Sequence, residues 1–156
     1  MILDCPDEVR THVELRFGQA GKAWADGVAD FLSDCCDRWQ LFPVKRLTGG
    51  LEQNIVLEVT ARGEAAVLKL GYPDADQIGE RDWLLAHQGR DCAQLLDSLD
   101  KPIVLLMERI VPGILLFDLI QGKEWSVERH RELANLLGGC TNEVQKGVRL
   151  PAMISC

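Results

Sequence analysis

The sequence predicts an α+β fold in which a five-stranded antiparallel sheet carries a helix packed across it. Its periodic segments come in blocks: two helical segments, three strands, a helix, two strands and further helical material. A parallel α/β fold would instead alternate strand and helix. The short turns ARGE and SLDKP join consecutive strands, which is typical of antiparallel hairpins.

Two helical segments come first in the chain. We predict a short helix over 7–17, with Asp7 and Glu8 near its start, and a longer helix over 22–39. The stretch GQAGK, residues 18–22, is predicted to break the helix between them. The longer helix has one apolar face at helical spacing. This face comprises Trp24, Val28, Phe31, Leu32 and Cys35.

Three strands are predicted next, over 44–48, 54–60 and 65–70. The turn GGLEQ joins the first strand to the second, and ARGE joins the second to the third. The middle strand alternates between apolar and polar residues, so one of its sides should be buried. The residues of this side are Ile55, Leu57 and Val59.

A further helix and two strands complete the predicted sheet. Pro73 and Asp74 suit the start of the helix and Gly89 suits its end. Two strands flank the turn SLDKP, and the second of them, 103–110, is nearly all apolar. After the break VPG, the helical pattern is clearest over 127–137.

Composition and charge narrow the classes of function. The chain has 156 residues, of which 47% are hydrophobic and 26% charged, enough for one globular domain with its own core. A net charge of −7 without any Lys/Arg run argues against a nucleic-acid partner. No stretch approaches the roughly 20 apolar residues of a membrane helix, and the N-terminus lacks a signal pattern. We therefore expect a cytoplasmic protein without a membrane partner.

The cysteines and histidines do not form a recognisable site. The six cysteines show neither a C-x-x-C pair nor a spacing typical of zinc ligands, and the three histidines are scattered. Reduced thiols that pack as small apolar groups are expected, and no metal site is predicted.

Lys69 interrupts the otherwise apolar strand AAVLKL and is the first candidate for function. Burying an ammonium group is costly unless it is paired, so Lys69 either reaches water along its stem or meets an anion. Lys69 lies on the same strand face as Val67. Glu80 follows eleven positions later and shares its helical face with Trp83 and Leu84, which makes it the expected partner of Lys69.

A glycine turn precedes this lysine. The sequence TGG contains Gly49 and Gly50, whose backbone N–H groups can approach a phosphate without a Cβ in the way. A lysine held by a glutamate beside such a turn is suited to binding an anionic phosphate. Each feature alone has a simpler explanation, namely an edge lysine, a solvated helix glutamate and a plain hairpin turn.

The sequence resembles the N-terminal lobe of the protein-kinase-like fold. Its sequence motifs are most similar to those of the aminoglycoside/hydroxyurea phosphotransferase family of small-molecule antibiotic kinases. The segments that carry this resemblance are WQL, AAVLKLGYPD, GERDWLLAHQGRDCAQLLDSLD and VLLMERIVPG, within residues 24–120. The resemblance divides the chain into an N-terminal helical segment (1–40), a kinase-like N-lobe (41–111), and the hinge exit with a truncated, partial set of C-lobe helices (112–156).

The resemblance also implies roles for individual residues. Lys69 would contact the α- and β-phosphates of ATP, Glu80 would orient Lys69, and the backbone of 108–110 would be the hinge that receives adenine. ATP and Mg²⁺ are the implied cofactors, and an aminoglycoside-like antibiotic the implied acceptor. The candidate cofactor-binding residues are Gly49, Gly50, Val67, Lys69, Glu80, Glu108, Arg109 and Ile110.

The sequence departs from the family pattern both at the glycine turn and after the hinge. TGGLEQN is not a full G-x-G-x-x-G, and no H-G-D-x-x-x-x-N catalytic loop or later metal-binding aspartate motif is present. Asp118, in LFDLIQG, lacks the required spacing. We expect a truncated, catalytically incomplete antibiotic phosphotransferase that self-associates through exposed apolar surface. The alternative is a non-catalytic nucleotide-binding or protein-interaction remnant.

Overall fold

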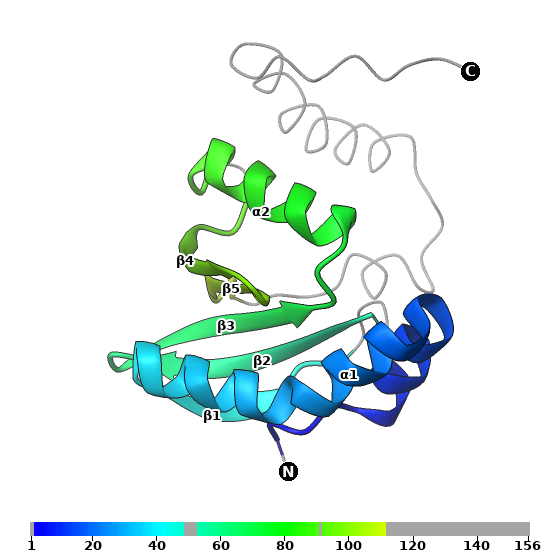
Figure 1. Cartoon of the computed structure of the whole chain (residues 1–156). Coiled ribbons are helices and arrows are strands. Elements are labelled where there is room, and N and C mark those ends of the chain that lie inside the picture. Colours follow the sequence, from blue (N-terminus) through cyan, green and yellow to red (C-terminus); the bar gives the residue numbers. More distant parts are fainter. Residues whose placement is uncertain (1, 49–52, 91, 112–156) are drawn as a thin grey trace, which may run out of the picture. The chain divides into compact units, whose positions relative to one another are not determined.

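The computed structural model describes residues 2–48, 53–90 and 92–111. All of these described residues belong to one compact unit. The helix predicted over 127–137 lies outside the described residues. The described elements, shown in Figure 1, are α1 (Asp7–Trp39), β1 (Leu41–Arg46), β2 (Asn54–Ala61), β3 (Glu64–Gly71), α2 (Ala75–His87), β4 (Leu95–Asp100) and β5 (Ile103–Glu108).

The strands form the predicted five-stranded antiparallel sheet, in the order β1-β2-β3-β5-β4. The hairpin between β2 and β3 turns at Arg62 and Gly63, whose φ angles are 50° and 87°. Two consecutive residues with positive φ are characteristic of a type I′ turn, which matches the twist of the flanking strands. The predicted turn ARGE is therefore confirmed.

The largest differences from the predicted strand boundaries are in β1 and β5. β1 begins at Leu41 rather than at residue 44 and contains Pro43. This proline is tolerated because β1 is an edge strand, and the pairing with β2 shifts register between Pro43 and Lys45. β5 ends at Glu108 rather than at residue 110.

α1 consists of two helical segments that meet at Gly18, whose φ of 60° and ψ of −134° are not helical. The predicted break in GQAGK is therefore confirmed. Arg10 of the first segment donates a hydrogen bond to Asp26 of the second. Gly21 lies directly against the backbone of Val13, where a Cβ would overlap the carbonyl oxygen. The first segment thus folds back along the second.

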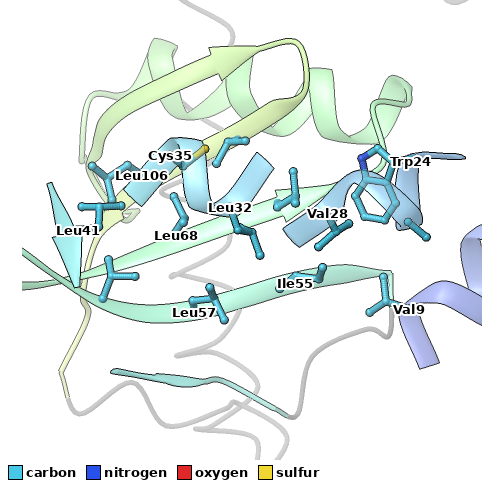
Figure 2. Close-up of a cluster of buried hydrophobic side chains, with 14 of the residues drawn as sticks. Val9, Trp24, Val28, Leu32, Cys35, Leu41, Ile55, Leu57, Leu68 and Leu106 are labelled. Carbon is cyan, nitrogen blue, oxygen red and sulfur yellow. The ribbon is translucent and has the colours of Figure 1, made fainter. Parts of the chain in front are cut away.

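The main hydrophobic core lies between α1 and one face of the sheet (Figure 2). Alternate residues of β2 face this core and are fully buried, as the sequence predicts. Burying each large aliphatic side chain contributes about 1.5–3 kcal/mol. The labelled members are Val9, Trp24, Val28, Leu32 and Cys35 from α1, and Leu41, Ile55, Leu57, Leu68 and Leu106 from the strands.

α2 packs on the opposite face, mainly against β4 and β5 (Figure 1). It begins as predicted, because the Asp74 side chain caps it by accepting a hydrogen bond from the backbone N–H of Gln77 at 3.1 Å. Its C-terminal half buries Leu84 against Ile103 and Leu105. The sheet is thus covered by α1 on one face and, over β4 and β5, by α2 on the other.

Candidate functional site

The face of β1, β2 and β3 that points away from α1 is only partly covered by the described residues. In an antiparallel sheet, directly paired residues share a face. Val56 pairs with Lys69, and Glu58 pairs with Val67. Val56 and Glu58 are half-buried, whereas the β2 residues between them on the other face are fully buried. This partly open face carries apolar side chains with Lys69 among them.

Lys69 and Glu80 form the predicted ion pair. The Nζ atom of Lys69 lies 2.7 Å from Oε1 and 2.6 Å from Oε2 of Glu80. The side chains are 18% and 32% exposed, respectively, so neither is fully desolvated. A lysine is therefore tolerated in this apolar strand because a carboxylate of α2 pairs with it.

The geometry of this pair leaves Lys69 able to bind a further anion. An ammonium group has three N–H donors, and Glu80 accepts two of them. The third donor remains for an oxygen of a ligand. Because both oxygens of Glu80 contact Nζ, the direction of the ammonium group is fixed rather than free to rotate with its stem.

The helical face of Glu80 explains its position. Leu84 lies one turn further along α2 and is buried against β5, and His87 is also buried. Anchoring these residues on the sheet brings Glu80 to the margin of the packed face, above β3. The sequence prediction that Glu80 shares an inward-looking face with Leu84 is confirmed.

Glu58 is a second charged residue on the same sheet face, and the sequence analysis did not identify it. Nε of Arg109 lies 3.3 Å from Oε2 of Glu58, and Nζ of Lys45 lies 3.8 Å from the same oxygen. The sequence places Glu58 at one of the polar positions of the alternating strand NIVLEVTA, on the side of Lys69. Its partners could not be read from local pattern, since Arg109 is 51 positions away.

The three predicted hinge residues have distinct environments. The backbone N–H of Glu108 donates to the carbonyl of Gln94 at 3.0 Å, so this donor is already used within the fold. The side chain of Arg109 turns back to Glu58 and also donates to the carbonyl of Ile110 at 2.7 Å. The Ile110 side chain is exposed. Their contact with a base stays a prediction.

The glycine turn lies outside the described residues, so the predicted roles of Gly49 and Gly50 stay predictions. Its two ends are described. The N–H of Leu47 donates to the carbonyl of Val56 at 2.8 Å, which continues the pairing of β1 and β2 toward the turn. Val56 pairs with Lys69 across the hairpin β2–β3. The turn therefore connects the strands at the end of the sheet that carries Lys69.

The described residues supply neither a metal cluster nor a membrane span. Among residues 2–48, 53–90 and 92–111, no group of three or more His, Cys, Asp or Glu side chains could hold a metal ion. The same part of the chain contains no helix long and apolar enough to cross a membrane.

Comparison with known proteins identifies the family. A family described as aminoglycoside/hydroxyurea antibiotic resistance kinases matches residues 38–138, which include the whole sheet and α2. This chain belongs to that family. The match spans Lys69 and Glu80 as well as the predicted hinge.

Individual members of the aminoglycoside/hydroxyurea kinase family show the same relationship. A hydroxyurea phosphotransferase of Kitasatospora aureofaciens is 31% identical over 121 residues, which cover 77% of this chain and 35% of that protein. A streptomycin 6-kinase of Streptomyces griseus is 29% identical over 105 residues, which cover 67% of this chain and 34% of that protein. A streptomycin 6-kinase of Streptomyces glaucescens is 27% identical over 110 residues, which cover 70% of this chain and 36% of that protein. The chain thus spans about a third of the length of these relatives.

Proposed function

We propose that this chain forms the nucleotide-binding lobe of an ATP-dependent phosphotransferase that acts on a hydroxyl group of an aminoglycoside-type antibiotic. The observation that carries the proposal is the two-point contact between Lys69 and Glu80. Membership of a family of antibiotic resistance kinases supports the reaction class. A cytoplasmic location, where ATP is available, is part of the same proposal.

The chemistry of the site supports phosphate binding by Lys69. Phosphoryl transfer depends mainly on positioning and on electrostatic stabilisation of the phosphate oxygens. The third donor of Lys69 is suited to one of those oxygens, and Glu80 keeps it in place. The apolar side chains of Val56 and Val67 on the same face are suited to stacking against a flat base. Mg²⁺ bound together with ATP would neutralise phosphate charge.

The test is titration of the chain with ATP by isothermal calorimetry, using wild type and Lys69→Met. We expect the variant to bind ATP on the order of ten- to a hundredfold more weakly, since a hydrogen bond to a charged group contributes about 1.5–3 kcal/mol. The matched control is Lys22→Met, because Lys22 lies on the exposed side of α1 and pairs with the exposed Asp26 of the same helix. Equal ATP affinity in wild type and Lys69→Met would refute the assignment.

A second candidate is nucleotide binding without phosphoryl transfer. It is favoured by one observation, namely that the sequence contains no H-G-D-x-x-x-x-N motif to supply the base for the acceptor hydroxyl. We expect no phosphorylation of streptomycin above background by this chain with ATP and Mg²⁺. Turnover well above background in a steady-state assay would exclude the non-catalytic alternative.

A further inference from the structure

A hydrogen bond between two neutral side chains joins the start of α2 to the start of β2. Nε2 of Gln77 donates to Oδ1 of Asn54 at 2.8 Å. Asn54 is the first residue of β2 and follows the segment that contains the glycine turn. Gln77 lies one helical turn before Glu80. Asn54–Gln77 and Lys69–Glu80 are therefore two consecutive links between α2 and the sheet.

The Asn54–Gln77 link is closely packed. Gln77 is only 7% exposed, although it is a polar residue in the first turns of a helix. Gly71 pairs with Asn54 in the sheet and lies directly beneath both side chains. A Cβ at this position would overlap Oδ1 of Asn54 and the amide group of Gln77. The absence of a side chain at Gly71 thus makes room for the hydrogen bond.

The two halves of α2 are held by different forces. The buried residues of the helix are Gln77, Leu84 and His87. Leu84 and His87 belong to the C-terminal half, which packs on the sheet through apolar contacts. In the N-terminal half, Gln77 is the only buried side chain, and its backbone N–H is also fixed by Asp74. The buried contact that positions this half, which leads into Glu80, is therefore Gln77. Arg16 of α1 adds ion pairs with Asp74 and Asp76 at 3.6 and 3.8 Å, which are partly exposed and contribute little.

We propose that Asn54 and Gln77 are positioning residues, which tie α2 to the strand following the glycine turn and thereby hold Glu80 on Lys69. The inference rests on the proposed function for its consequence, because a displaced Glu80 would release the lysine that is to bind phosphate. Neither residue needs to touch the nucleotide for this role.

The test measures the Lys69–Glu80 pair directly, without nucleotide. Each lysine of the intact chain is acylated with an N-hydroxysuccinimide ester, and mass spectrometry gives the rate at each site. Lys69 should react slowly in wild type, because both contacts with Glu80 must break before the amine can attack. In Gln77→Met and Asn54→Leu, the rate at Lys69 should rise about two- to tenfold, the population change expected on loss of one neutral hydrogen bond.

A conservative variant and two references separate positioning from general loosening. Asn54→Asp retains the acceptor oxygen and should keep the wild-type rate at Lys69. Gln19→Met removes an exposed glutamine of α1 and should change nothing. Lys22 and Lys45 report on the rest of the fold and should react equally in all variants. Calorimetry with ATP on the same proteins should show the affinity falling in the order in which labelling of Lys69 rises.

Each outcome bears on the proposal. Unchanged labelling of Lys69 in both Gln77→Met and Asn54→Leu would overturn it. A parallel rise at Lys22, Lys45 and Lys69 in both variants would also overturn it, because it would show a role in stability alone. If wild type binds no ATP, the proposed function fails while the labelling still decides whether Asn54 and Gln77 position Glu80.

Discussion

Glu58 links two other parts of the chain on the open sheet face. It is half-buried in the middle of β2, and it brings together Lys45 from the edge strand and Arg109 from the chain after β5. Through Arg109, this carboxylate fixes the segment that follows β5 beside β2. Removing its charge would leave the guanidinium of Arg109, itself half-buried, without an anionic partner.

We predict that Glu58→Gln lowers the free energy of unfolding by about 1–2 kcal/mol, between the values typical of exposed and of buried ion pairs. Urea denaturation followed by tryptophan fluorescence measures the change. Glu64→Gln is the matched control, since Glu64 is exposed at the start of β3. If the double variant Glu58→Gln/Arg109→Met is destabilised by the sum of the single effects, then the two residues do not interact and the prediction is wrong.

Cys35 gives a prediction that depends on pH. Burial raises the pKa of its thiol from 9.0 to about 11, with smaller contributions from Cys36 and Asp34. The folded state therefore keeps the proton where the unfolded chain loses it. The resulting stabilisation is complete below pH 9 and is lost as the pH rises through about 11.

The measurable consequence is low reactivity of Cys35. At pH 8 its thiolate fraction should be about a hundredfold lower in the folded than in the unfolded chain, and its side chain is also inaccessible. Labelling with a maleimide and peptide mapping should find Cys35 unmodified while half-buried Cys36 reacts. Modification of Cys35 as fast in buffer as in denaturant would contradict its placement in the core.

At the scale of elements, α1 depends on a single glycine. Gly18 has φ 60° and ψ −134°, a conformation that a residue with a Cβ adopts only with strain. We predict that Gly18→Ala destabilises the protein by about 1–2 kcal/mol, although nothing lies near the position that the new Cβ would occupy. Thermal and urea unfolding would measure the loss.

Gly79 provides a control of opposite sign. It lies inside α2 with open space around it and no positive φ. Gly79→Ala should therefore stabilise the protein by about 0.5–1 kcal/mol, because alanine has the higher helix propensity. Equal effects of the two substitutions would show that the break at Gly18 does not depend on its backbone conformation.

Elements with a strong local signal could be predicted from the sequence. The alternation of β2, the turn at Arg62 and Gly63, and the cap at Asp74 are set by neighbouring residues, and the structure confirms them. The pair Lys69–Glu80 followed from two such patterns placed eleven residues apart. Its prediction needed only the face of a strand and the face of the next helix.

The remaining features depend on which strands become neighbours. β5 lies between β3 and β4, and no local pattern specifies this order. The contact of Arg109 with Glu58 and that of Gln77 with Asn54 join residues 51 and 23 positions apart. The start of β1 at Leu41 could not be predicted, because a proline at position 43 argues against a strand unless the strand lies at the edge of the sheet.

At the scale of the whole described unit, the two edges of the sheet are protected against pairing with other chains. β1 carries Pro43, Lys45 and a register shift between them. β4 carries Asp97 and Asp100, and Asp97 accepts a hydrogen bond from the indole of Trp39 at 2.8 Å. Association of two copies by addition of strands is therefore disfavoured.

Exposed apolar side chains after β5 lead us to predict weak self-association. The run that begins at Ile103 is buried in the sheet through Leu106, but Ile110 and Val111 are 49% and 79% exposed. Arg109 holds this segment beside Glu58, so the two side chains are presented in a fixed place rather than on a free end. Covering one such side chain in a second copy would contribute about 1.5–3 kcal/mol.

Static light scattering at several concentrations tests this prediction. The mean mass of wild type should rise with concentration, and Val111→Asp should weaken the association at least about tenfold, because a carboxylate cannot be buried there without a partner. Leu15→Asp is the matched control: Leu15 is equally exposed but lies on the N-terminal segment of α1, and its replacement should leave the mass unchanged. The acidic net charge of −7 opposes association, so added salt should strengthen it. A monomer at every concentration, with a cooperative melt, would show that Ile110 and Val111 do not form an interface between copies.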